Sequence, residues 1–176
     1  MMSPLPSVLL ADGPDPLGPP ELLQFGRFVG SWTLEVIWFN ADGTVARRLP
    51  GEWHFGWILE GRAIADVWIV PPRPRRDPSA PPLGECGMTV RFYDAAAGAW
   101  RSTWHGPVNR VVMPFLARQI GDEMVLERSE DGAITRWVFS AVTPDSFLWR
   151  NLVSEDHGAT WRLQQEMHAR READAR

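Results

Sequence analysis

Hydrophobic and polar residues alternate along most of this chain, and the alternation is clearest between Glu52 and Val70. This stretch reads EWHFGWILEGRAIADVWIV and predicts two strands joined by a tight turn at Glu60-Gly61. Residues that face each other across a hairpin share one side of the sheet. Counting outward from the turn, one side carries three tryptophans, a phenylalanine and a single carboxylate: Trp53, Trp57, Trp68, Phe55 and Asp66. If that side faces inward, Asp66 stands in an apolar wall.

The same period of two continues through the rest of the chain, with short turns between the segments. The expected strands cover residues 30–39, 44–59, 62–70, 87–93, 100–105, 112–120, 124–129, 134–142, 146–153 and 161–170. Strands joined by tight turns form an antiparallel meander, and a long meander closes to remove its edges. The pattern therefore predicts an all-β fold, a ten-stranded antiparallel up-and-down barrel with a short N-terminal helix over residues 21–28.

Proline-rich segments set the expected boundaries of the domain. Residues 1–20 contain six prolines and predict a flexible arm without regular structure. The barrel domain is expected over residues 21–171, followed by a frayed tail at 172–176. Residues 71–85 form a second proline-rich loop, which is either disordered or a lid over one end of the barrel.

Missing residue types exclude several chemistries. All 18 basic residues are arginine, so catalysis through a lysine imine, a P-loop and pyridoxal phosphate attachment are excluded. The single cysteine, Cys86, excludes an internal disulfide. The four histidines lack the spacing of a zinc site. We therefore expect no metal and no cofactor.

Charge and hydropathy limit the expected partners and location. A net charge of −4 without a basic cluster argues against nucleic acid and against a membrane surface as partners. The N-terminus lacks the features of a signal peptide, and no apolar run is long enough to span a membrane. These features predict a cytoplasmic protein, with a homodimer as one possible assembly.

Several motifs match a known pattern. Gly30-Ser31-Trp32, GEWHFGWILEGRAIADVW, MTVRFYD and the SFLWR segment resemble bacterial lipocalin-like (calycin-type) barrels of a domain-of-unknown-function family. The resemblance implies that Trp32 plugs the closed end and that Arg91 has a role in its motif. Nitrobindins are more distant relatives by the same resemblance, which makes His168 the residue to consider for haem. Residues 154–161 also match the Asp-box turn, a structural hairpin in families that carry it.

The aromatic strand faces suggest a ligand-binding interior. Ten tryptophans either fill the barrel or line a cavity for a flat, apolar molecule, and we favour the cavity because rings of this size pack poorly without a guest. The candidate binding residues are Trp38, Trp53, Phe55, Trp57, Trp68, Trp104 and Trp149.

Acid–base groups in such a cavity raise the possibility of catalysis. The candidate catalytic residues are Asp66, as proton donor or acceptor, with Arg91 and Tyr93 polarising a carbonyl. Asp66 could instead form a structural ion pair with Arg91 or Arg150, and sequence does not decide which face of strand 87–93 points inward. The preferred hypothesis is a cofactor-free cyclase or isomerase of bacterial secondary metabolism, acting on a polyketide or terpenoid-like substrate. The alternatives are a small-molecule carrier or sensor and a nitrobindin-like haem protein.

Overall fold

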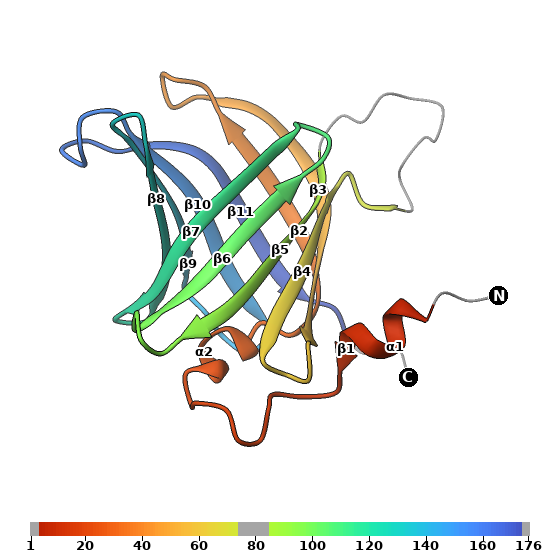
Figure 1. Ribbon diagram of the computed structural model, residues 1–176. Helices are drawn as coiled ribbons and strands as arrows, with labels where there is room; N and C mark the ends of the chain where they lie inside the picture. The colour runs from red at the N-terminus through yellow and green to blue at the C-terminus, as the bar shows by residue number, and fades with distance from the viewer. Residues whose placement is uncertain (1–3, 74–84, 174–176) are drawn as a thin grey trace.

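A closed antiparallel barrel of ten strands forms the body of the protein (Figure 1). The computed structural model describes residues 4–73 and 85–173. Its helices are α1 (Leu5–Leu9) and α2 (Leu22–Gly26), and a two-residue strand β1 (Leu10–Ala11) lies between them. The barrel strands are β2 (Gly30–Phe39), β3 (Val45–Ile58), β4 (Ala63–Val70), β5 (Glu85–Asp94), β6 (Ala99–Gly106), β7 (Val111–Ile120), β8 (Glu123–Glu130), β9 (Ala133–Ser140), β10 (Ser146–Ser154) and β11 (Arg162–Arg171).

The strand order confirms the up-and-down barrel expected from the sequence. Each strand from β2 to β11 pairs with its neighbours in the chain, β11 pairs with β2, and every pairing is antiparallel. Because β11 pairs with β2, the ring of strands is complete and neither of these two strands is left as an edge strand.

The hairpin between β3 and β4 has the predicted register. Trp53 lies opposite Trp68, and Phe55 lies opposite Asp66. Glu60 and Gly61 have φ values of 59° and 79°. Leu59 also has a positive φ of 52°, so the turn between Ile58 and Ala63 contains three left-handed residues in a row, one more than a two-residue hairpin turn requires. The turn therefore fixes which side chains of both strands point into the barrel.

Aromatic side chains close one end of the barrel beside α2. Phe25 and Phe28 are fully buried, and their ring centroids lie 5.8 Å and 4.8 Å from that of Phe139. The indole Nε1 of Trp32 donates to the carbonyl oxygen of Phe28 at 2.8 Å. The guanidinium of Arg171 lies 4.1 Å from the centre of the Trp32 ring system and covers it from outside. This end of the barrel is filled by protein side chains.

The N-terminal arm is more ordered than predicted. The sequence suggested no regular structure over residues 1–20, yet α1 and β1 form, and Leu10 and Ala11 pair with Ile58 and Trp57. The reason is that β3 extends to Ile58, beyond the start of its partner β2, whose first residue lies opposite Phe55. The end of β3 keeps free backbone groups on that side, and the arm pairs with them. Most of the proline-rich loop, residues 74–84, lies outside the described residues.

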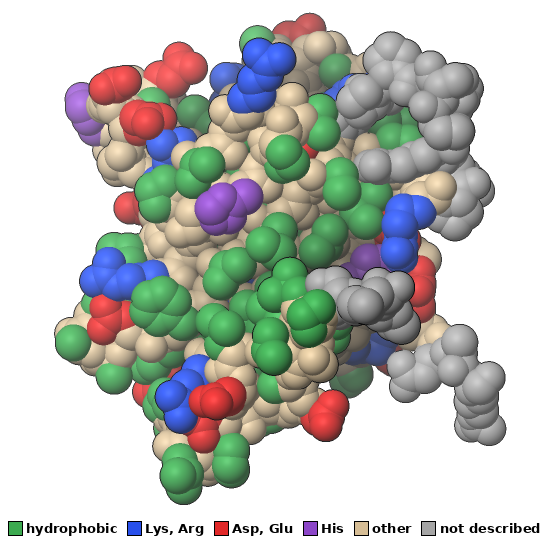
Figure 2. Space-filling model, turned by 45° about the vertical axis from the view of Figure 1, so that its right-hand side comes forward, with side chains coloured by type: hydrophobic (Ala, Val, Ile, Leu, Met, Phe, Trp, Pro, Cys, Tyr) green, Lys and Arg blue, Asp and Glu red, His purple; other side chains and the backbone are tan. Residues whose placement is uncertain are grey.

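Exposed hydrophobic side chains gather on the outside of the barrel, and Figure 2 shows such side chains clustered on one face. On the outer faces of β5 and β7, Met88, Phe92, Val112 and Leu116 are all exposed. Across the described ranges, no helix combines the length and the apolar character needed to cross a membrane. The possible homodimer stays a prediction.

Candidate functional site: an aromatic cavity inside the barrel

A cavity of about 540 Å³ lies inside the barrel, on the side away from the aromatic plug beside α2. Val108 and Asn109 of the β6–β7 connection and Val111 at the start of β7 form part of its lining, which places that connection at the cavity wall. Six tryptophans dominate the rest of the lining: Trp38, Trp53, Trp68, Trp104, Trp137 and Trp149. The interior is thus packed with side chains at one end and hollow towards the other.

Five of the seven predicted binding residues line this cavity, namely Trp38, Trp53, Trp68, Trp104 and Trp149. The other two, Phe55 and Trp57, are buried in the packed half of the barrel. The ring centroid of Phe55 lies 5.9 Å from that of Phe28, and the Trp57 indole packs against Gly26 of α2. Alternation in the sequence identifies the inward face, but it does not show where along the barrel the α2 plug ends.

Trp137, Asn151 and Gln165 line the cavity although they were not among the predicted site residues. They lie side by side, because Trp137 pairs with Asn151 and Asn151 pairs with Gln165. Gln165 lies on the same strand face as Met167, so its inward position could have been inferred from the alternation. Trp137 could also have been found, because it alternates with the buried Phe139 along β9.

Arg91 and Asp66 form an ion pair that is fully buried in the barrel wall, with 1% and 0% of their side chains exposed. Arg91 Nη2 donates to Asp66 Oδ2, and Trp53 Nε1 donates to Asp66 Oδ1 at 2.6 Å. Burial raises the pKa of Asp66, while the charge of Arg91 opposes that shift. The inward face of strand 87–93 is therefore the one that carries Thr89 and Arg91.

Only one member of this pair reaches the cavity. Arg91 is part of the cavity lining, whereas Asp66 lies behind it. The Nε and Nη1 groups of Arg91 have no hydrogen-bond acceptor among the described residues, and its guanidinium lies 4.4 Å from the Phe25 ring centroid. Arg150, the other partner considered for Asp66, instead contacts Glu123 at 3.2 Å. The geometry leaves Arg91 facing the cavity and Asp66 holding it.

Tyr93 lies apart from the cavity lining. It is half-buried near the end of β5, and its ring centroid is 5.8 Å from that of Trp100. Partial burial and then the nearby charge of Glu21 raise the pKa of its phenol. Of the three predicted catalytic residues, Arg91 and Asp66 are thus brought together, and Tyr93 is not.

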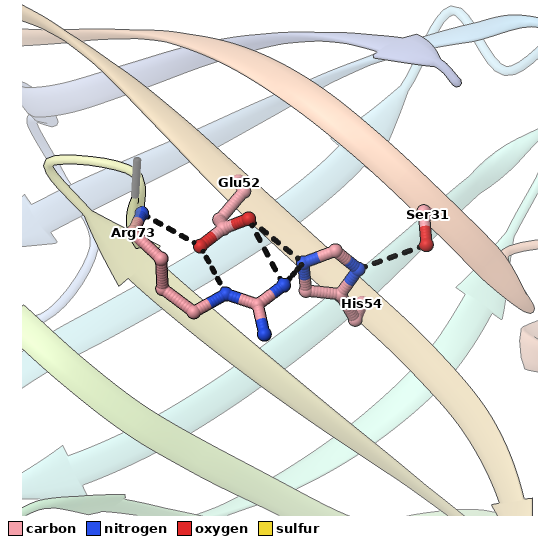
Figure 3. A network of polar contacts seen from close by, with 4 residues as sticks. All are labelled: Ser31, Glu52, His54 and Arg73. Atoms are coloured by element: carbon pink, nitrogen blue, oxygen red, sulfur yellow. Dashed lines mark hydrogen bonds and ion pairs between the residues drawn. The ribbon is translucent and has the colours of Figure 1, made fainter. Parts of the chain in front are cut away.

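A second polar network lies on the outer face of β3 (Figure 3). The backbone N and Nε of Arg73 donate to Glu52 Oε1 at 2.9 Å and 2.7 Å. His54 contacts Glu52 through Nε2 at 3.2 Å and Ser31 Oγ through Nδ1 at 2.8 Å. Burial alone would raise the pKa of Glu52, but the hydrogen bonds from Arg73 and His54 and the charge of Arg73 lower it to about 2. The network ties Arg73 to the barrel wall, outside the cavity.

The Asp-box residues form the structural turn expected from the motif. Asp156 Oδ1 accepts from Thr160 N at 2.8 Å, and its Oδ2 accepts from the Thr160 hydroxyl at 2.6 Å. Hydrogen bonds from Thr160 and Ser154 lower the pKa of Asp156 to about 2. The Trp161 indole closes the turn by donating to the Gly158 carbonyl at 3.1 Å. These contacts join β10 to β11 at a distance from the cavity lining.

The described part of the chain contains no group of three histidine, cysteine or acidic side chains placed to hold a metal ion. His168, the residue considered for haem, is exposed on the outer face of β11 and contacts Glu166 at 2.6 Å. Its neighbour Met167 points inward and lines the cavity instead. In this conformation, His168 does not present a ligand to the barrel interior.

Comparison with known proteins supports the fold and leaves the family open. No protein family model matches the chain, and no curated protein matches it significantly. Among solved structures, the chain is similar to an S-type phycobiliprotein lyase, CPES, from Guillardia theta, with a TM-score of 0.53 and 13% identity. The match covers 89% of this chain and 99% of the lyase chain. The lipocalin-like barrel is thus shown, whereas the domain-of-unknown-function and nitrobindin resemblances gain no support from a family model.

Proposed function

We propose that this protein binds an apolar, ring-bearing small molecule inside its barrel. The observation that carries the proposal is the cavity of about 540 Å³ walled by six tryptophans. A volume in this range suits one small-molecule ligand, and indole faces offer large contact areas to flat hydrocarbon rings. The solved structure of similar fold is named as a phycobiliprotein lyase, which supports an active role, not a purely structural one, for a barrel of this fold.

A second candidate function is catalysis without a cofactor, as a cyclase or isomerase. The observation that favours it is Arg91, a buried cation at the cavity wall. Its Nε and Nη1 groups have no hydrogen-bond acceptor among the described residues. Such a group polarises a carbonyl oxygen of a bound polyketide or terpenoid-like molecule of secondary metabolism, while the aromatic walls hold one conformer. In this mechanism Asp66 is a positioning residue, because it touches Arg91 and not the cavity.

Fluorescence tests the binding proposal directly. We expect 8-anilinonaphthalene-1-sulfonate to bind with one-to-one saturation and to receive energy from the cavity tryptophans. The absence of saturable energy transfer with this probe and with other flat hydrophobic molecules would refute the proposed function. A positive binding result with no turnover of any bound candidate substrate would leave the carrier or sensor function.

A further inference from the structure

Three polar side chains form a continuous band on the cavity wall, and we call Trp137, Asn151 and Gln165 the polar row. They sit on the adjacent strands β9, β10 and β11, directly opposite one another in the pairing register. All three line the cavity. The pairing continues on either side of the row to Leu126 on β8 and Trp38 on β2, which also line the cavity. The row is therefore a polar strip between two apolar flanks.

Each member of the polar row has a buried polar atom without a hydrogen-bond partner among the described residues. These atoms are Trp137 Nε1, Asn151 Oδ1 and Gln165 Nε2. Gln165 is 92% buried, since only 8% of its surface is exposed. Buried polar groups in folded proteins almost always have partners, so three neighbouring exceptions call for a common explanation.

The neighbouring contacts fix which kind of partner is missing. The Asn151 side-chain nitrogen donates to Gln164 Oε1 at 3.2 Å, so its Oδ1 is left as the acceptor. Trp137 Nε1 can only donate, and Gln165 Nε2 is also a donor. The row thus offers two donors with one acceptor between them. A partner molecule that satisfies all three atoms needs acceptor oxygen together with an N–H or O–H donor.

We propose that the ligand of this cavity carries a carbonyl oxygen beside an N–H or O–H group, and that this edge docks on the polar row. The inference rests on the proposed function and names its ligand class: flat ring systems with a lactam-like or hydroxy-carbonyl edge. Gln165 Nε2 donates to the carbonyl oxygen, Asn151 Oδ1 accepts from the adjacent N–H or O–H of the ligand, and Trp137 Nε1 is a second donor on the other side of Asn151. The tryptophans on the remaining walls hold the rings.

A pair of matched probes tests this assignment. Phenanthridin-6(5H)-one has a lactam edge on a three-ring skeleton, and phenanthrene is the hydrocarbon of the same shape. Equilibrium dialysis measures the Kd of each probe with the wild-type protein and with Gln165→Met. We expect the substitution to weaken lactam binding about tenfold, the effect of a 1.4 kcal/mol hydrogen bond, and to change phenanthrene binding less than about threefold.

Two further variants make the outcome unambiguous. Gln119→Met serves as the control, because the Gln119 amide bonds to the Gly121 carbonyl on the exposed β7–β8 turn, and it should leave both Kd values unchanged. Trp137→Phe removes a second donor of the row and should repeat the selective loss if Gln165→Met does not fold. Equal effects of these substitutions on both probes would overturn the inference while leaving the proposed function intact. If neither probe binds the wild-type protein but 8-anilinonaphthalene-1-sulfonate does, this inference alone is overturned. If none of the three binds, the proposed function fails and this inference fails with it.

Discussion

Arg91 and Asp66 face each other in a pairing that excludes solvent from both side chains, and only Arg91 continues to the cavity. Each charge is therefore held in the wall mainly by the other. Asp66 also accepts from Trp53, so the pair is linked to the aromatic lining through one of its tryptophans. This arrangement makes the pair a structural support that places a cation at the cavity wall.

Breaking this pair should destabilise the protein strongly. Asp66→Asn leaves the Arg91 guanidinium buried without a counter-ion, and we expect a loss of about 3–5 kcal/mol in the free energy of unfolding. The double variant Asp66→Leu with Arg91→Met removes both charges and should recover most of that loss. Urea denaturation measures both effects. An Asp66→Asn variant as stable as the wild type would show that the pair does not hold the wall.

The low pKa of Glu52 predicts acid sensitivity. The pKa of this group falls from an ordinary value of 4.5 to about 2 on folding, so its contribution is complete above pH 4.5 and is lost as the pH falls towards 2. Solvent screens the exposed Arg73 guanidinium, so we expect a contribution of about 1 kcal/mol. Glu52→Gln should be less stable at pH 7 and should lose less stability on acidification. Denaturation at pH 7, 4 and 3 compares the two proteins, and parallel pH profiles would contradict the prediction.

Two tryptophan substitutions should separate stability from binding. Trp32→Phe removes the buried hydrogen bond to the Phe28 carbonyl at the closed end, and we expect a loss of about 1–3 kcal/mol in stability with ligand affinity retained. Trp38→Phe changes the cavity lining at a half-buried position and should reduce affinity with a smaller loss of stability. Thermal melts and probe titrations of both variants check this contrast. A reversed pattern would mean that the closed and hollow ends are wrongly assigned.

Close packing at Gly87 predicts a further effect on the cavity. A Cβ atom at this position would lie 2.3 Å from the Trp104 ring and 2.6 Å from the His105 carbonyl oxygen. Gly87→Ala should therefore push the Trp104 indole from its place in the lining, lowering both stability and probe affinity. Gly56→Ala on β3 is the matched control, because nothing lies within 4 Å of the added carbon. Melting temperatures and Kd values of the two variants should differ, and equal values would contradict the prediction.

The strand pattern carried most of the information about the fold. Alternation and turn residues were enough to predict ten strands, and Glu60-Gly61 set the register that brings Trp53 opposite Trp68. The site was less predictable because it depends on contacts between distant strands. The sequence around each arginine does not indicate that Arg91, and not Arg150, reaches Asp66, because both arginines lie in strands with alternating polar and apolar residues. Likewise, the division between Trp57 in the packed end and Trp68 in the cavity depends on how far α2 enters the barrel.

The central claim is that the ligand binds inside the barrel and not on the exposed apolar outer face, and two substitutions decide between these surfaces. Met113→Trp adds an indole at a lining position of β7, and Phe92→Ser removes an exposed ring from the outside of β5. Titration of 8-anilinonaphthalene-1-sulfonate against both variants is the most direct measurement. We predict at least a tenfold loss of affinity for Met113→Trp, about 1.4 kcal/mol, and no change for Phe92→Ser. Unchanged binding by Met113→Trp together with lost binding by Phe92→Ser would contradict the claim.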